Sequence, residues 1–340
     1  MSLSAAEVEF QSNKGPEPLK ERLQAKLHQY PSISPVMVLL ISGAVFWILN
    51  PNFKDPFNLS LVVQQVAVVG AVAVGQTIII LTAGIDLSCG AIAVFASMVM
   101  GRTAFANHLP GWESLIIGLL VGTAAGAFNG FLVTKIKLPP FIVTLGTFNI
   151  FNALTLLYAT GRDIQASEMN STLVWMGTTF KAGRFQITLG VILMLLMYLV
   201  LSYALRFTAW GRHVYATGDD VEAARLAGIE TKRVIFSVYM VAGLIFALAA
   251  WILIGRTGAA SAINGIDLNL DSITAVVIGG TSLFGGRGRI IGSFYGAVIV
   301  GVFRDGLTLA GLPPYYQSLA VGILVITAVT IDQWIRKANK

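Results

Sequence analysis

Five long segments of this chain contain no charged side chain. They are residues 114–134, 138–161, 186–205, 234–255 and 313–331. Each is close to the roughly 20 apolar residues that carry an α-helix across the hydrocarbon core of a bilayer. Charged residues make up only 12% of the chain, against about 25% in a soluble domain. A soluble protein with buried helices does not need such runs, so the sequence predicts an all-α polytopic membrane protein.

The hydropathy pattern predicts about ten membrane-spanning helices. If the N-terminus is cytoplasmic, the segments between the spans lie alternately on the cytoplasmic and the outer side. Most lysines and arginines then fall in cytoplasmic segments. This bias follows the positive-inside rule, so both termini are predicted to be cytoplasmic. We expect residues 1–33 to form a cytoplasmic tail without a signal peptide, and residues 34–335 to form the transmembrane domain. The predicted spans are 35–50, 59–82, 88–101, 113–134, 139–160, 186–205, 234–255, 272–285, 290–303 and 315–331.

Two motifs recur in the same order in the two halves of the chain. Gly84-Ile85-Asp86-Leu87-Ser88 matches Gly265-Ile266-Asp267-Leu268-Asn269, and Leu138-Pro139-Pro140 matches Leu312-Pro313-Pro314. The halves, about 59–160 and 234–331, begin five spans apart, an odd number, so they should be inverted relative to each other. The first Gly-Ile-Asp-Leu motif is then expected inside and the second outside. In transporters, inverted repeats place a pathway at their interface near the middle of the membrane.

Glycines recur every four residues on two predicted spans. Gly118, Gly122, Gly126 and Gly130 form one face of the fourth span, and Gly288, Gly292 and Gly296 do the same at the ninth. Lipid supplies no hydrophobic drive between helices, so close backbone approach must provide packing energy. We therefore expect both faces to be tight helix contacts.

Polar side chains interrupt several predicted spans and are candidates for a substrate pathway. Neutral amides in membrane helices either bond to neighbouring helices or line a polar path, and as a set they favour a neutral polar solute over an ion. Asp86 has a second possible role, because it could cap the N-terminus of the third span. The candidates are Gln64, Gln65, Gln76, Asp86, Asn129, Asn149 and Asn152.

The predicted cytoplasmic loop 206–233 contains the signals of one short helix. Asp219 and Glu222 resemble a capping box, with Asp in place of the usual Ser or Thr. Arg225 follows the acidic start, which suits the helix dipole, and Gly228 suits a C-terminal stop. A helix of about two turns is not stable alone, so it must pack on its own bundle or on another protein.

Three segments resemble the permeases of ribose-type sugar importers of the ATP-binding cassette (ABC) class, the ribose/xylose/arabinose/galactose/fructose permease family. Glu222-Ala223-Ala224 with Gly228 is similar to the loop by which ABC permeases dock on their ATPase. The wider stretch 211–229 and the segments 82–88 and 275–288 also resemble these permeases. The resemblance covers roughly residues 35–335.

This resemblance implies a multi-pass protein of the bacterial cytoplasmic membrane that translocates a monosaccharide or a related small polyol. The implied partners are an ABC ATPase, a periplasmic or extracellular sugar-binding protein, and a second permease copy, identical or different. The residues that would couple to the ATPase are Asp219, Asp220, Glu222, Ala223, Ala224, Arg225 and Gly228.

Other chemistries lack their signatures in this sequence. A nucleotide-binding P-loop needs a Gly-Lys pair, which the chain does not contain, so ATP and Mg²⁺ are expected at the ATPase and no cofactor on this chain. The histidines lack metal-ligand spacing, Cys89 is the only cysteine, and no catalytic set is readable. We therefore predict no catalytic residue, no metal site and no nucleic-acid partner. The rivals are an ABC permease for a branched-chain amino acid or a signalling furanose, and an ion-coupled secondary transporter.

Overall fold

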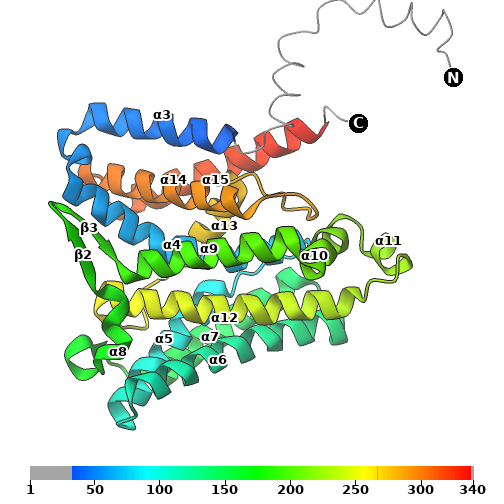
Figure 1. Ribbon diagram of the computed structural model, residues 1–340, viewed down its shortest axis with the longest axis horizontal. Helices are drawn as coiled ribbons and strands as arrows, with labels where there is room; N and C mark the ends of the chain where they lie inside the picture. The colour runs from blue at the N-terminus through cyan, green and yellow to red at the C-terminus, as the bar shows by residue number, and fades with distance from the viewer. Residues whose placement is uncertain (1–32, 266, 338–340) are drawn as a thin grey trace, which may run out of the picture.

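The computed structural model describes residues 33–265 and 267–337, and these fold as a bundle of helices (Figure 1). The predicted tail 1–33 lies almost wholly outside the described residues. The strands are β1 (Ile164–Gln165), β2 (Thr179–Ala182), β3 (Phe185–Thr188) and β4 (Ala259–Ala260). The helices are α3 (Ile33–Leu49), α4 (Pro56–Leu81), α5 (Cys89–Ala106), α6 (Gly111–Phe131), α7 (Pro140–Ala159), α8 (Ser171–Val174), α9 (Leu189–Phe207), α10 (Ala209–Asp219), α11 (Val221–Leu226), α12 (Thr231–Thr257), α13 (Leu268–Ile278), α14 (Ile290–Leu309) and α15 (Pro314–Lys337).

Every predicted span coincides with a helix, and within the described ranges seven helices are long and apolar enough to cross a membrane. The prediction for 272–285 is wrong at its C-terminal end. Helix α13 stops at Ile278 after 11 residues, and residues 279–289 form a loop. The cause is local, because Gly280, Gly285 and Gly286 take positive φ angles of 82°, 81° and 67°, which a helix does not allow.

The bundle has two distinct ends (Figure 1). The C-terminus of α9, the helices α10 and α11 and the start of α12 lie at one end, which we call the α11 end. The β2–β3 hairpin, α8 and the end of α12 lie at the other, which we call the hairpin end. Residues 161–185, expected only as a connection between two spans, cover this end, and their strand β1 pairs with β4 after α12. The predicted span 186–205 begins too early, because β3 continues to Thr188 and α9 starts at Leu189.

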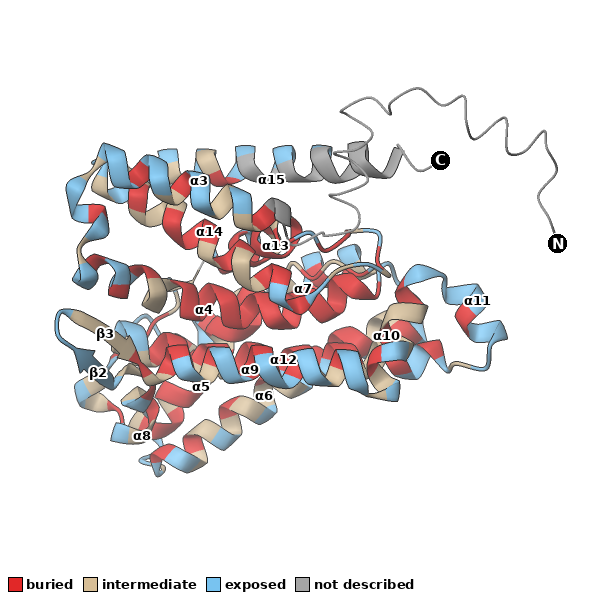
Figure 2. Ribbon diagram, turned by 45° about the horizontal axis from the view of Figure 1, so that its top comes forward, coloured by how far each residue is buried: buried red, intermediate tan, exposed pale blue. Residues whose placement is uncertain are grey.

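Helix α4 forms the centre of the molecule and is buried for most of its length (Figure 2). Asp55 caps its start by accepting the backbone N–H of Phe57 at 2.9 Å, and Pro56 occupies the first helical position, where its missing N–H costs nothing. From Val66 to Leu81 every residue is buried, and most of the α4 side chains there are apolar. A helix that is apolar on all sides is expected in the interior, and α12, α13, α14 and α9 pack around it.

The two halves of the chain contain matching sets of helices. Helices α4 to α7 correspond in order to α12 to α15, with a Gly-Ile-Asp-Leu motif before α5 and before α13. The predicted positions of these motifs on opposite sides of the membrane are wrong. The N-termini of α5 and α13 meet inside the bundle, where the backbone N–H of Gly90 donates to Oδ1 of Asn269 at 2.5 Å. The segments that carry the motifs fold back between the spans, because polar ends of broken helices can satisfy one another there.

From this meeting point α5 and α13 run in opposite directions, as an inverted repeat requires. Helix α5 ends at the hairpin end, where Arg102 donates to Thr160 at 2.7 Å. Helix α13 ends at the α11 end, where the loop that follows it reaches Leu81 at the end of α4. The predicted inversion of the halves therefore agrees with the direction of their broken helices.

The repeats are interlocked through their third helices. Helix α6 of the first half packs on α12 of the second, and α14 of the second half packs on α4 of the first. The glycine face of α6 makes this possible: a Cβ added at Gly122 would meet the backbone of Gly243, and one at Gly126 would meet the carbonyl of Tyr239. The predicted tight contact is confirmed for α6.

The glycine face of α14 is confirmed in part. Added Cβ atoms at Gly292 and Gly296 would meet the carbonyls of Gly279 and Ala275 on and next to α13. Gly288 does not belong to this face. It lies two residues before α14 begins, with φ 147°, and serves the preceding turn.

Candidate functional site

The meeting point of α5 and α13 joins the two Gly-Ile-Asp-Leu segments. Besides bonding to Gly90, Asn269 Oδ1 lies 3.5 Å from the sulfur of Cys89, which is also 3.5 Å from the Ser272 hydroxyl. A Cβ at Gly90 would collide with the Asn269 side chain and lie 3.1 Å from Cβ of Leu268. Close contact between the two helix ends therefore requires glycine at position 90.

A cavity of about 270 Å³ lies beside this junction, between α5, α7 and the segment that precedes α13. Its polar groups are the amides of Asn152 and Asn269, and Phe148, Leu156 and Ile263 supply apolar walls. Pockets that hold drug-sized ligands are about 300–1,000 Å³ and combine apolar walls with a few placed polar groups. This cavity has the same chemistry at a slightly smaller size, which suits a small neutral polar solute.

Asp86 belongs to a buried network next to the junction. Its Oδ1 accepts from the backbone N–H and the hydroxyl of Ser88, each at 2.6 Å. The Asn129 amide in turn donates to the Ser88 hydroxyl at 2.8 Å. Asp86 thus forms an Asx turn before α5 and does not cap it, because the N-cap residue is Ser88, whose side chain forms no cap hydrogen bond. Neither Asp86 nor Asn129 lines the cavity.

The remaining pathway candidates are dispersed. Gln76 is fully buried in α4, and neither of its amide atoms has a hydrogen-bond partner among the described residues. Gln64 and Gln65 are half-buried nearer the hairpin end of α4. Asn149 is exposed on α7 and donates to the carbonyl of its own helix at Leu145, 3.0 Å away. Of the seven candidates, the structure brings only Asn152 to the cavity.

Sequence reasoning missed two residues at this site, Gly90 and Asn269. Asn269 is the last residue of the second Gly-Ile-Asp-Leu motif, so the repeat contained a signal for it. No local pattern points to its contact with Gly90, because the two residues are far apart in the chain.

The candidate coupling residues form α11, with one correction to the predicted cap. Asp220, not Asp219, is the N-cap: its Oδ1 accepts the N–H groups of Glu222 and Ala223 at 2.9 Å each. Asp219 is the last residue of α10, an amphipathic helix that the sequence reasoning did not predict. Glu222 therefore does not complete a capping box, and pairs instead with Arg225 at 2.9 Å.

The C-terminal stop of α11 is the predicted one. Gly228 takes a φ of 86°, and the N–H of Ile229 bonds back to the carbonyl of the buried Ala224 at 3.0 Å. The tip of the helix projects from the bundle (Figure 1), with Leu226 84% exposed. Val221, at the start of the helix, is 41% exposed as well, so α11 presents two apolar side chains together with its charges to the outside.

Helix α10 connects α11 to the bundle. Trp210 donates from its indole to the Ser237 hydroxyl of α12 at 2.9 Å. Tyr215 donates to the carbonyl of Gly288 at 2.9 Å. Burial raises the pKa of this phenol and outweighs the opposing effect of Arg289, so the hydroxyl keeps the proton that it donates. At the C-terminal end of α10, a Cβ added at Gly218 would collide with the carbonyl of Leu81 and the N–H of Gly286, so glycine permits this close approach. Helix α10 thus connects α11 to the end of α4 and to the loop after α13.

A buried ion-pair cluster lies in the second half, in the part of the bundle toward the hairpin end. One Nη of Arg304 on α14 lies 2.8 Å from Asp271 and 3.2 Å from Asp267. The Asp271 and Arg304 side chains are 5% and 15% exposed. The sequence shows each charge separately, and only the packing of α13 on α14 brings them together.

The fold and these sites define a class: a polytopic membrane protein with inverted repeats, broken helices meeting at its centre and a projecting helix at one end. The chain belongs to the family described as the branched-chain amino acid transport system / permease component, whose model matches residues 58–329.

Curated relatives cover most of the chain. It is 50% identical over 323 residues to the fructose import permease protein FrcC of Rhizobium meliloti, which covers 94% of this chain and 90% of the relative. It is 39% identical over 301 residues to the ribose import permease protein RbsC of Bacillus subtilis, with 88% and 92% covered. It is 35% identical over 301 residues to the D-allose transport system permease protein AlsC of Escherichia coli, with 88% and 91% covered.

Proposed function

We propose that this chain is the membrane-spanning subunit of an ABC importer that carries a monosaccharide into the cell. The observation that carries the proposal is the family match over residues 58–329, with relatives named as permeases for fructose, ribose and allose. A small cavity with two amides and apolar walls suits a neutral hydroxylated solute of this size.

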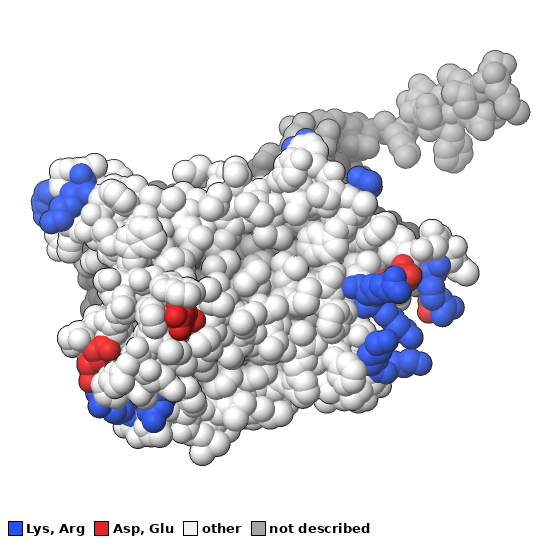
Figure 3. All heavy atoms as spheres, turned by 60° about the horizontal axis from the view of Figure 1, so that its bottom comes forward, with Lys and Arg blue, Asp and Glu red and all other residues white. Residues whose placement is uncertain are grey.

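The α11 end faces the cytoplasm in this proposal. Basic side chains gather there (Figure 3), and positive charge favours the cytoplasmic side. The hairpin end would then face the sugar-binding protein, and α15 would bring the C-terminus to the cytoplasm. The described basic residues at the α11 end are Lys135, Lys137, Arg206, Arg212, Arg225, Lys232, Arg233, Arg287 and Arg289.

The partner at the α11 end would be an ABC ATPase that receives α11. A helix of six residues is held by a cap at Asp220 and a turn at Gly228, yet it leaves Leu226 in solvent. ATP and Mg²⁺ would bind the ATPase, so this subunit would catalyse no reaction of its own. Movement of the ATPase would pass through α11 and α10 to the end of α4, which leads into the first Gly-Ile-Asp-Leu motif, and to the loop 279–289 after α13.

A second permease copy would cover the flank formed by α7. This helix is among the least buried spans, with 28% of its apolar window buried. It carries the exposed amide of Asn149 and, about one turn later on the same face, Asn152 at the cavity. An amide facing lipid is unfavourable, and a pathway between two copies would give both amides polar surroundings.

An ABC permease for another small solute is the remaining alternative, because the family description names branched-chain amino acids. The cavity disfavours it: a zwitterionic amino acid needs charged partners, and the polar side chains that line this space are neutral amides.

Uptake by reconstituted vesicles tests the proposal. The chain would be reconstituted with an ABC ATPase and a sugar-binding protein encoded beside it, and uptake of labelled fructose, ribose, allose and leucine compared. We expect ATP-dependent uptake of a sugar. Uptake by this chain alone, driven by a proton or sodium gradient, would overturn the proposal, and ATP-driven uptake of leucine only would favour the alternative solute.

The same vesicles test the pathway. Asn152→Ala should lower sugar uptake by about tenfold or more, because a hydroxyl that bonds to a buried amide loses its partner. Gln64→Ala removes a half-buried amide of α4 that lies outside the cavity, and it is the matched control for that loss. An Asn152→Ala variant with unchanged uptake would exclude the cavity from the pathway.

A further inference from the structure

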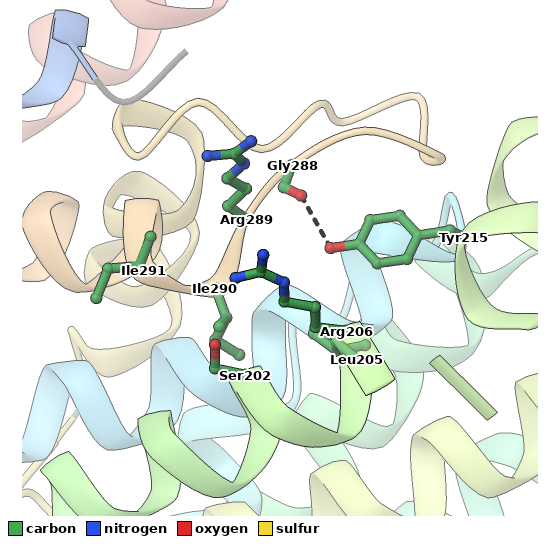
Figure 4. A pocket seen from close by; sticks show the side chains of 8 residues that line it. All are labelled: Ser202, Leu205, Arg206, Tyr215, Gly288, Arg289, Ile290 and Ile291. Atoms are coloured by element: carbon green, nitrogen blue, oxygen red, sulfur yellow. Dashed lines mark hydrogen bonds between the residues drawn. The ribbon is translucent and has the colours of Figure 1, made fainter. Parts of the chain in front are cut away.

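A second and larger cavity lies at the α11 end, away from the junction of α5 and α13. Its volume is about 470 Å³, and it lies between the last turn of α9, Tyr215 of α10 and the start of α14 (Figure 4). The proposed transport cycle uses the neighbouring helices α10 and α11, but it gives this space no role.

Two arginines line this cavity from different elements (Figure 4). Arg206 lies in the last turn of α9, one turn after Ser202 on the same face. Arg289 is the residue directly before α14. Both are exposed, and neither forms an ion pair within the part of the chain that the structure describes. Two guanidinium groups facing one space repel each other unless an anion lies between them.

The chemistry of the lining selects the anion. Guanidinium groups match the oxygens of a phosphate with paired, charge-assisted hydrogen bonds, and the Ser202 hydroxyl offers one more donor. Nothing acidic lines the cavity. The site therefore suits a phosphate oxyanion.

The position of the cavity suggests where the phosphate comes from. Next to it, α9 presents Leu199, Tyr203 and Phe207 to the outside, each more than 60% exposed, and Ile291 of the lining is 44% exposed. The cavity thus opens at the boundary between the apolar belt and the charged α11 end. In the proposed orientation, this is the level of the phosphates of the cytoplasmic leaflet, where basic pockets between membrane helices bind anionic headgroups.

We propose that Arg206, Arg289 and Ser202 bind the headgroup phosphate of an anionic phospholipid from the cytoplasmic leaflet. The bound lipid would connect α9 to the loop 279–289, whose Gly286 donates to Leu81 at the end of α4. It would therefore hold in place the same loop that α10 contacts through Tyr215. This inference rests on the orientation in the proposed function.

Lipid retention by the purified subunit tests the site. The full chain in detergent would be incubated with phosphatidylglycerol or phosphatidylcholine, and bound lipid counted by native mass spectrometry. We expect the parent protein to retain phosphatidylglycerol. The Arg206→Gln/Arg289→Gln variant should retain about tenfold less of it, or still less, which is the size expected when charge-assisted hydrogen bonds are removed. The matched control is Arg212→Gln/Lys232→Gln, which removes two exposed charges at the same end but outside the cavity and should retain the lipid.

The outcomes separate the possible sources of phosphate. Equal retention of both lipids, or equal losses in the cavity variant and the control, would overturn the proposal. Thermal unfolding would also be measured with millimolar inorganic phosphate. If phosphate protects the parent protein but not the cavity variant, and phosphatidylglycerol protects neither, the site binds free phosphate and the lipid source is overturned. If the double variant does not fold, Arg206→Gln alone decides, since it changes one exposed side chain. Binding is measured without ATPase or sugar, so a failure here leaves the proposed transport function intact.

Discussion

Single residues in the interior have functions that depend on their partners across the bundle. Arg304 is the clearest case, since it neutralises Asp271 and reaches Asp267 from the next helix. A charge in such surroundings is tolerated only as part of a pair, because leaving water costs each ion several kcal/mol.

Arg304→Met should lower the free energy of unfolding by about 3 kcal/mol, because it leaves the Asp271 carboxylate buried without its cation. Thermal unfolding in detergent measures the loss. Asp271→Leu/Arg304→Met removes both charges and should recover most of the stability. A double variant no more stable than the single one would mean that the ion pair is not the source of the loss.

Gly90→Ala should lower stability by about 1–3 kcal/mol and reduce sugar uptake, because its methyl group would be forced into Asn269 at the junction of the broken helices. Gly146→Ala is the control, since a Cβ there meets nothing within 4 Å, and Ala favours a helix over Gly. Equal effects of the two changes would contradict a close contact between α5 and α13.

Among the elements, α10 and α11 show how a short segment gains a defined shape. Helix α11 is too short to form alone. It is held by the Asp220 cap, by the turn at Gly228 and by α10, which is anchored on α12 through Trp210 and Ser237. A helix held in this way moves together with a partner bound to it, whereas a flexible loop of the same length would change its own conformation instead.

Glu222→Lys should abolish most ATP-driven uptake in the assembled complex while the subunit still inserts and folds. The reason is that Glu222 is exposed and pairs only with Arg225, so reversing its charge alters the docking surface rather than the bundle. Uptake and thermal unfolding would be measured together. The control is Lys232→Glu, which also reverses one charge at the same end but lies outside α11. Normal uptake by Glu222→Lys would count against docking through this helix.

For the whole molecule, the inverted repeat explains why two broken helices meet at the centre. Each third helix packs on the first helix of the other half, so neither half has a complete core alone. Because of this packing, we expect a movement at the α11 end to be felt by both halves together, as alternating access between inverted repeats requires.

Accessibility to labelling reagents tests the orientation of the whole molecule. In a Cys89→Ala background, Leu226→Cys should react with a membrane-impermeant thiol reagent only after the cytoplasmic face is exposed. Lys181→Cys in the β2–β3 hairpin should react from the outside, because both side chains are exposed at opposite ends. The reverse pattern would contradict the proposed orientation and move the inferred phosphate site to the outer leaflet. The parent protein should stay unlabelled, since Cys89 is buried.

Hydropathy and the scarcity of charge were enough to predict the membrane class and the long apolar helices, and the repeated motifs together with the count of spans predicted the inverted halves. The spacing of Gly118, Gly122 and Gly126 predicted a tight helix face because one helix turn places them together. The short helix at 221–226 was predicted from its acidic start and Gly228, although its cap was assigned one residue too early, since the amphipathic α10 continues through Asp219.

Contacts between distant residues could not be predicted in this way. The junction of Gly90 with Asn269 and the cavity at Asn152 join elements from both halves, and the cluster of Arg304 with Asp271 joins two helices of the second half. Local sequence determines which segments become helices, because helix formation and membrane insertion depend on neighbouring side chains. Whether a helix crosses the bilayer or breaks inside it depends on which polar groups the other half brings into contact, and that was settled only when the two halves packed together.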